Sequence, residues 1–244
     1  MTVVLLDETL RFPPPRMADP DGLLAIGGDL SPERLLEAYR IGIFPWYVQG
    51  QPILWWSPDP RLVLFPHKLH LSRSLRKTLR TRQFTVSMDG CFEQVIHLCG
   101  AVRSEHREDT WITAEMEAAY NLLHHMGVAH SVEVWSGDRL AGGLYGVSLG
   151  KAFFGESMFS LENDASKTAL AALVSFMLFH GFHWIDCQVT TDHLLRMGAE
   201  EIARNRFLGL LRNTIREPGI VGRWELPDGW LDALIGPLHH PSSS

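Results

Sequence analysis

The 244-residue sequence predicts an α+β protein with a mixed β-sheet. Three observations point to this class: helical patterns come first, a glycine-interrupted hairpin follows, and a long apolar helix then precedes another strand. Hydrophobic residues make up 45% of the chain, enough for a sizeable core. Near residue 60 the sequence changes from turn- and proline-rich segments to regular helix and strand patterns. This change predicts a small N-terminal domain over 1–60, a larger domain over 61–236 and a flexible tail over 237–244.

The first 60 residues are rich in turns and prolines, with one expected helix. Ser31 is the expected N-cap, Pro32 occupies the first helical position, and Gly42 ends the apolar pattern. Beyond residue 60, Ser72 and Thr113 are expected to cap two more helices.

A third helix, over 92–99, is expected between the two that Ser72 and Thr113 cap. The second half predicts strands and one long helix. A hairpin is expected over 131–140, and glycines in its returning strand indicate a bulge or a close backbone approach. A strand is expected over 153–159. Asn163 or Asp164 is expected to cap a buried helix over 165–180, which leads to a strand over 184–189.

Composition favours a cytoplasmic protein with reduced thiols. The three cysteines are Cys91, Cys99 and Cys187, which is an odd number without C-x-x-C spacing, so neither a disulfide framework nor a zinc site is expected. No signal peptide is apparent, and the longest apolar run, 169–179, is far shorter than the ~20 residues of a membrane span.

A local basic stretch stands out against the net charge of −6. Seven basic residues and no acidic one lie between Asp59 and Asp89, and such a cluster favours phosphate binding. A solvated helix face explains the same pattern equally well. The candidate phosphate contacts are Lys68, Arg73, Arg76, Lys77, Arg80 and Arg82.

Common nucleotide, metal and hydrolase motifs are absent from the sequence. There is no P-loop, no dinucleotide-binding glycine motif and no H-E-x-x-H. The segment around Ser157 lacks the second glycine of a nucleophile elbow. No metal and no cofactor is therefore expected.

The strand over 184–189 carries the main candidate site. Side chains alternate along a strand, so Asp186 and Gln188 are expected on one face and Ile185 and Cys187 on the other. Buried carboxylates are rare unless paired or functional. A cap of a neighbouring turn is the alternative role for Asp186, and Cys187 is interpreted as a small core hydrophobe.

Glu156 is the second candidate because it lies in a dense apolar strand. Alternation places it on one face with Phe154 and Met158. Either a cationic ligand or a buried arginine partner would explain a charge at this position.

Eight colinear blocks resemble the leucyl/phenylalanyl-tRNA–protein transferase family. They are GGDLSP at 27–32, GIFPW at 42–46, LWWSPDPR at 54–61, TWI at 110–112, AHSVEVW at 129–135, GESMFS at 155–160, ASK at 165–167 and IDCQ at 185–188. The resemblance implies a small N-terminal domain packed on a GCN5-related acyltransferase domain, although the glycine-rich turn that cradles the pyrophosphate of coenzyme A is missing here.

The resemblance also implies a reaction. Leu or Phe, and less well Met, would pass from aminoacyl-tRNA to the α-amine of proteins that begin with Arg or Lys, which marks them for degradation. A monomer that acts without a membrane is expected. The alternatives are a transferase that extends a cell-wall precursor, and a noncatalytic module that binds tRNA or peptide.

Residue roles follow from the same resemblance. Asp186 orients Gln188, whose carbonyl accepts a hydrogen bond or proton from the attacking amine, and Glu156 with Asp186 binds the basic N-terminal residue. The implied side-chain pocket consists of Leu144, Phe153, Met158, Leu170, Leu173 and Ile185. The aromatic candidates for the terminal adenosine of tRNA are Trp46, Trp111, Tyr39 and Tyr120.

Two of these pocket positions depart from the family pattern. Leu144 replaces a common methionine and Leu173 a common phenylalanine. The two departures imply a shifted preference among Leu, Phe and Met as the transferred amino acid. A difference of one methylene group changes such discrimination by about 1–3 kcal/mol.

Overall fold

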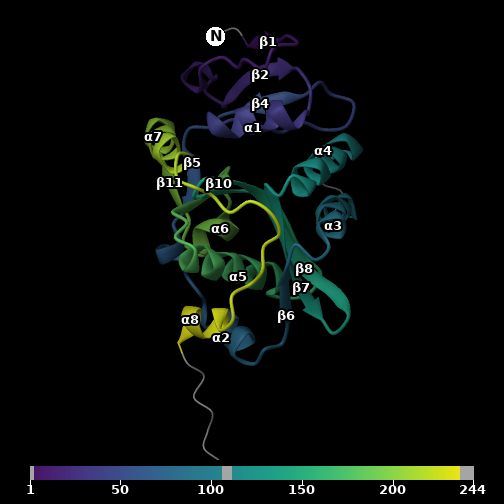
Figure 1. Cartoon of the computed structure of the whole chain (residues 1–244), viewed down its shortest axis with the longest axis vertical. Coiled ribbons are helices and arrows are strands. Elements are labelled where there is room, and N and C mark those ends of the chain that lie inside the picture. Colours follow the sequence, from purple (N-terminus) through teal and green to yellow (C-terminus); the bar gives the residue numbers. More distant parts are fainter. Residues whose placement is uncertain (1–2, 106–111, 237–244) are drawn as a thin grey trace, which may run out of the picture.

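A computed structural model describes residues 3–105 and 112–236. Trp111 and the expected tail over 237–244 lie outside the described residues. Figure 1 shows a small N-terminal sheet at one end of the molecule and a larger sheet, flanked by helices, that fills the rest. None of the helices within the described ranges combines the length and hydropathy that a bilayer crossing requires.

The N-terminal sheet has four strands in the order β1-β2-β4-β3. Its strands are β1 (Val4–Leu6), β2 (Leu23–Gly27), β3 (Phe44–Pro45) and β4 (Leu54–Trp56). The short helix η1 (Pro15–Met17) and the helix α1 (Pro32–Arg40) belong to the same segment. Ser31 caps α1 as predicted, because its side chain accepts a hydrogen bond from the Arg34 N–H.

The larger sheet has seven strands in the order β11-β5-β10-β9-β8-β7-β6. They are β5 (Arg61–Leu64), β6 (Thr85–Met88), β7 (Ala129–Ser136), β8 (Arg139–Leu149), β9 (Ala152–Ser160), β10 (Trp184–Gln188) and β11 (Glu200–Ile202). Among the strands of the described residues, only β9 and β10 pair in parallel in this sheet, so the predicted α+β class with a mixed sheet is confirmed.

Helices cover both faces of the larger sheet. They are η2 (Pro66–Lys68), α2 (Arg73–Arg80), α3 (Phe92–Glu105), α4 (Ala114–His125), α5 (Ala165–Phe179), α6 (Asp192–Arg196), α7 (Arg204–Thr214) and α8 (Trp230–Ile235). One apolar cluster joins α1, α3, α4 and α7 to one face of the sheet, and a second joins α2, α5 and α8 to the other. The strand β10 lies between the two clusters, at the centre of the molecule.

The capping predictions had mixed outcomes. Ser72 and Thr113 cap α2 and α4 as expected. Asp164 precedes α5 with a left-handed φ of +67° and makes no capping hydrogen bond. Its carboxylate accepts instead from the Lys167 ammonium at 2.6 Å and the Thr78 hydroxyl at 3.3 Å, so the prediction of a side-chain cap at Asp164 was wrong.

The glycine in the middle of β8 marks a close approach, as its position predicted. A Cβ atom on Gly146 would lie only 2.6 Å from the Phe153 ring and would overlap the carbonyl oxygen of Phe154. The pairing of β8 with β9 also shifts register between Tyr145 and Gly146. Both features that glycine indicated, the bulge and the tight contact, therefore occur at this point.

Candidate active site

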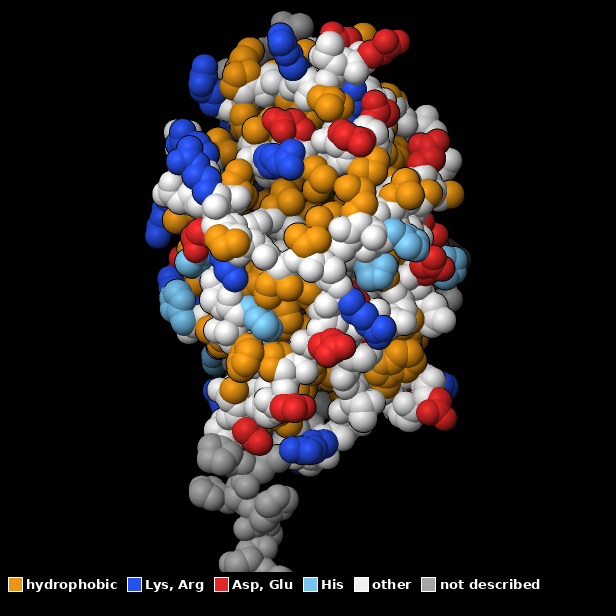
Figure 2. Space-filling view, in the orientation of Figure 1, with side chains coloured by type: hydrophobic (Ala, Val, Ile, Leu, Met, Phe, Trp, Pro, Cys, Tyr) orange, Lys and Arg blue, Asp and Glu red, His pale blue; other side chains and the backbone are white. Residues whose placement is uncertain are grey.

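A cavity of about 250 Å³ opens beside the centre of the larger sheet. Its wall contains all six residues expected to form the side-chain pocket: Leu144, Phe153, Met158, Leu170, Leu173 and Ile185. The strands β8, β9 and β10 and the helix α5 supply them, and Phe44, Pro45 and Trp46 close the cavity from the N-terminal sheet. On the face drawn in Figure 2, hydrophobic side chains gather below the N-terminal sheet.

The bulge in β9 places Glu156 at the rim of this cavity. Gly155 pairs with Gly146 and Ser157 with Tyr145, so Glu156 is the extra residue on its strand. Phe154 packs in the cluster on the α4 side, whereas Met158 packs in the cluster on the α5 side. The expectation that Phe154, Glu156 and Met158 share one face was wrong, because a bulge inverts the alternation that follows it.

Two tyrosines hold the carboxylate of Glu156. The Tyr39 hydroxyl, from α1, donates to Oε1 at 2.7 Å, and the Tyr120 hydroxyl, from α4, donates to Oε2 at 3.1 Å. The two hydroxyls also contact each other. Both rings are almost fully buried, with exposed fractions of 1% and 0%, and offer no face to an adenine. The structure therefore contradicts their expected role as stacking platforms for tRNA.

Burial controls the ionisation of this cluster. It raises the pKa of Glu156 to about 7, and the nearby charge of Asp186 acts in the same direction, against the hydrogen bonds from Tyr39, Tyr120 and Gln188. Burial, followed by the proximity of Glu156, also raises the pKa of both tyrosines well above the usual value. The phenols consequently keep their protons at neutral pH.

Asp186 is paired inside the protein. The Arg61 guanidinium, from β5, donates from Nε to Oδ1 at 2.8 Å and from Nη2 to Oδ2 at 2.6 Å, and neither side chain is exposed. Nη1 of the same guanidinium donates to the carbonyl of Gly42 at 3.3 Å. This bidentate pair leaves Asp186 without exposed surface, whereas the resemblance implied contact with the basic N-terminal residue. The alternative role, a cap of a neighbouring turn, is present, because the Asp186 carboxylate accepts from the backbone N–H of Gln188 two residues further on.

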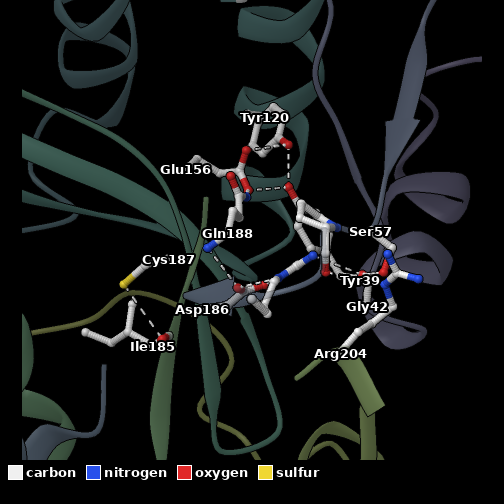
Figure 3. Close-up of polar contacts among 12 residues, drawn as sticks. Tyr39, Gly42, Ser57, Tyr120, Glu156, Ile185, Asp186, Cys187, Gln188 and Arg204 are labelled. Carbon is white, nitrogen blue, oxygen red and sulfur yellow. Dashed lines mark hydrogen bonds and ion pairs between the residues drawn. The ribbon is translucent and has the colours of Figure 1, made fainter. Parts of the chain in front are cut away.

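Gln188 links the two carboxylates (Figure 3). Its backbone N–H donates to Asp186 Oδ1 at 2.9 Å, and its side-chain Nε2 donates to Glu156 Oε1 at 2.6 Å. The residue has a left-handed φ of +63°, and the β10–β5 pairing shifts register between Asp186 and Gln188. This kink turns Gln188 to the rim of the cavity, whereas Asp186 does not line it.

Cys187 lines the cavity together with Ile185, on the side of β10 opposite to Asp186 (Figure 3). It is half-buried and packs against the apolar cluster on the α5 side, so its interpretation as a small hydrophobe of the core is confirmed, at the point where that core meets the cavity. Burial, and then the charge of Asp186, raise the pKa of its thiol. The side chain is therefore a neutral wall of the cavity and a poor nucleophile.

Of the three aromatic candidates within the described residues, Trp46 is the accessible one. It is 37% exposed, lines the mouth of the cavity, and lies 5.8 Å from the Trp56 ring, centroid to centroid. The Trp56 indole N–H donates to the backbone carbonyl of Trp46 at 2.7 Å, which steadies this proline-framed segment.

The basic stretch divides into three environments. Arg61 is the buried partner of Asp186, and Lys68 donates to Glu200 at 2.6 Å. The remaining residues lie on α2 or immediately after it and are mostly exposed: Arg73, Arg76, Lys77, Arg80 and Arg82. Basic side chains are scattered on the face that Figure 2 shows, without a continuous patch.

Arg61 is the site residue that sequence reasoning missed. It is one of the seven basic residues of that stretch but not one of the six candidate phosphate contacts, and it begins β5 after a proline-rich turn. The available signal was the buried carboxylate itself, because a buried Asp requires a partner and arginine fits a carboxylate bidentately. Among the described residues, no group of three or more His, Cys, Asp or Glu side chains is placed to hold a metal.

The fold and the cavity define a class: an α+β protein with a largely apolar cavity next to a carboxylate–carboxamide pair. Residues 63–212 match the family described as leucyl/phenylalanyl-tRNA protein transferase, and residues 28–59 match its N-terminal domain. The chain belongs to this family and is an aminoacyl-tRNA-dependent transferase.

Relatives span nearly the whole chain. The leucyl/phenylalanyl-tRNA–protein transferase of Desulfatibacillum aliphaticivorans is 57% identical and covers 93% of this chain and 97% of its own length. That of Syntrophus aciditrophicus (strain SB) is 53% identical, with 97% and 99% covered. Among solved structures, L-PGS from Bacillus licheniformis has a TM-score of 0.40 at 8% identity, with 69% of this chain and 54% of that chain covered. A similarity of that size carries no functional argument.

Proposed function

We propose that this enzyme transfers Leu, Phe or Met from aminoacyl-tRNA to the α-amine of proteins that begin with Arg or Lys. The product would be a protein marked for degradation in the cytoplasm. The observation that carries the proposal is the apolar cavity whose rim holds a carboxylate, Glu156, and a carboxamide, Gln188. An apolar side chain fits the wall, and a cationic N-terminus is attracted to the rim.

The cavity selects the donor by the side chain of its amino acid. Six apolar residues and the neutral thiol of Cys187 form most of the wall, which Ser157, Thr191 and His193 complete, so a charged side chain would lose most of its hydration there. The side chains of Leu, Phe and Met meet no such penalty. Leu144 and Leu173 lie in this wall, at the positions where the family pattern has larger residues.

The rim orients the acceptor amine. The carboxamide nitrogen of Gln188 donates to Glu156, which leaves its carbonyl oxygen as the acceptor for an N–H of the incoming amine. Asp186 acts through Gln188 and not on the substrate. Its carboxylate accepts a hydrogen bond from the backbone N–H of Gln188 and is fixed by the ion pair with Arg61. Such positioning contributes strongly to the aminolysis of an ester, where effective molarity supplies roughly 7–11 kcal/mol.

We further propose two contacts for tRNA. Trp46 offers an accessible ring at the cavity mouth on which the unpaired terminal adenosine would stack. The exposed basic residues of α2 would contact backbone phosphates without reading sequence. The segment over 1–60 and the segment over 61–236 would act as two domains, with the cavity closed by Phe44, Pro45 and Trp46 from the first.

A transfer assay tests the proposal. Labelled Phe-tRNA is incubated with the enzyme and with one of two peptides that differ only in an N-terminal Arg or Ala. Label on the Arg peptide alone is the expected result. Label on both peptides would refute the acceptor specificity, and label on neither would refute the proposed function.

A further inference from the structure

The reaction requires a proton acceptor, and neither Gln188 nor Asp186 supplies one. An α-ammonium has a pKa near ~7.7–8.0, so most of the acceptor is protonated at pH 7. A carboxamide such as Gln188 accepts a hydrogen bond but is not a base near neutral pH. The carboxylate of Asp186 is fully buried and bound bidentately by Arg61, which keeps it from the substrate.

We propose that Glu156 is the general base that takes the proton of the incoming α-ammonium, and that Tyr39 and Tyr120 are positioning residues that hold its carboxylate ready for that proton. The inference rests on the proposed transfer to an N-terminal amine and deepens it.

The three oxygen-bearing groups form a closed ring of contacts. Tyr39 contacts Glu156 Oε1, Tyr120 contacts Glu156 Oε2, and the two phenols contact each other. When Glu156 is ionised, the ring holds two protons for three contacts. When Glu156 is protonated at Oε2, each contact has its own proton, because Glu156 donates to Tyr120, Tyr120 to Tyr39, and Tyr39 to Oε1. The ring is therefore built to receive one more proton.

Glu156 reaches the substrate through the same cavity. Glu156 is 7% exposed and lines the cavity beside Gln188, whose Nε2 lies 2.6 Å from Oε1. An amine that is hydrogen-bonded to the carbonyl oxygen of Gln188 therefore lies next to Glu156. Within the described ranges, no lysine, arginine or histidine forms a salt bridge with Glu156, so the place of its counter-ion is available to the ammonium.

The surroundings of Glu156 bring its pKa close to that of the α-ammonium from which it would take a proton. It faces Tyr39 of α1 and Tyr120 of α4, whose ring meets Tyr145 of β8 edge-on, and the Arg61–Asp186 pair of β5 and β10 lies behind Gln188. Burial raises the pKa of Glu156 to about 7, close to that of an α-amine. Proton transfer between groups of similar pKa is nearly balanced in both directions.

The proton balance of the step is complete. Glu156 removes a proton from the α-ammonium, and the neutral nitrogen attacks the ester carbonyl, which forms the new C–N bond. The C–O bond to the ribose then breaks, the nitrogen loses a second proton and the ribose oxygen gains one. Glu156 releases its proton to solvent before the next turnover, so the net reaction is ammonium plus ester to amide, alcohol and one proton.

The first test is Glu156→Gln in the full-length enzyme, with Phe-tRNA and an Arg-initiated peptide over pH 6–9. General-base catalysis typically contributes about 10²–10⁴-fold, so kcat should fall by that order near pH 7, with little change in KM for the peptide. The loss should shrink as the pH rises past the pKa of the amine. A raised KM with an unchanged kcat would show that Glu156 only binds the basic residue, and would overturn the proposal.

The second test separates positioning from folding. Removing a phenol that donates to the carboxylate raises the pKa of Glu156, so Tyr39→Phe and Tyr120→Phe should each move the acid limb of the kcat/KM profile to higher pH. Tyr47→Phe is the matched control, because this buried phenol contacts the Thr113 hydroxyl instead. An unmoved limb in both variants would refute the positioning role.

Failure of this inference is distinguishable from failure of the proposed function. If the wild-type enzyme labels neither peptide, the proposed function is wrong. If the wild type labels the Arg peptide and Glu156→Gln keeps the full rate at pH 6.5, the transfer stands and Glu156 is not the base.

Discussion

Replacing Asp186 by Asn should abolish transfer and destabilise the fold together, for one structural reason. The substitution leaves the Arg61 guanidinium with no exposed surface and without its ionic partner. Removal of one member of a buried ion pair costs about 3–5 kcal/mol of unfolding free energy. In a chain of this size each kcal/mol lowers the melting temperature by roughly 2–4 °C. Arg61 also lies over the rings of Phe44 and Phe207, at 4.7 and 4.5 Å from their centroids, so it has no alternative route to solvent.

A double-mutant cycle separates the two effects. Arg61→Met alone leaves Asp186 as an unpaired buried carboxylate and should also cost about 3–5 kcal/mol. The double variant Arg61→Met/Asp186→Asn buries no net charge and should recover most of that stability in urea unfolding. Its transfer activity should remain low, because an amide oxygen holds the Gln188 backbone N–H less firmly than a carboxylate does.

The cycle has two refuting outcomes. An unchanged transfer rate in Asp186→Asn would show that Asp186 does not position Gln188. Single variants that each lose less than about 1 kcal/mol, a loss typical of exposed pairs, would show that the pair is not sealed from solvent.

Four further outcomes are expected. Leu173→Phe narrows the cavity, so competition between Phe-tRNA and Leu-tRNA should shift toward Leu by about 1–3 kcal/mol, and an unchanged ratio would place the side chain elsewhere. Trp46→Ala should weaken tRNA binding by about 1–3 kcal/mol, measured by titration of labelled aminoacyl-tRNA, if the adenosine stacks on it. Arg80→Glu should raise KM for tRNA and reduce its salt dependence, whereas equal salt slopes would mark α2 as a solvated face. Gly146→Ala should destabilise the β8–β9 bulge by about 1–3 kcal/mol or more in urea unfolding, while Gly209→Ala, on a helix with open space around it, serves as the control and should be neutral or stabilising.

The long elements followed from local patterns. The apolar spacing and caps of α1, α2 and α4 predicted these helices correctly, and the glycines of β8 predicted a bulge. Strands β1, β2, β4, β5, β6 and β11 have only three to five residues each, so the alternation of their side chains is a weak signal. These short strands form because a neighbouring strand supplies their backbone partners, which local sequence does not reveal.

The polar centre depended on contacts between distant residues. Asp186 meets Arg61 across 125 positions, and Glu156 meets Tyr39 across 117. The sequence made Tyr39 and Tyr120 candidates for stacking on adenosine, whereas the fold buries their rings and uses their hydroxyls. Residue type alone does not distinguish these two uses of a tyrosine.

The sequence by itself determined the α+β class through its periodicity and the family through its motif order, and the resemblance to that family implied the six residues that line the cavity. Only the tertiary structure decided which polar groups act together. The bulge at Glu156 and the left-handed backbone of Gln188 each break the alternation of their strand, and so bring both side chains to one rim. Such breaks persist because buried polar groups must find hydrogen-bond partners, and those partners are set by the packing of separate elements.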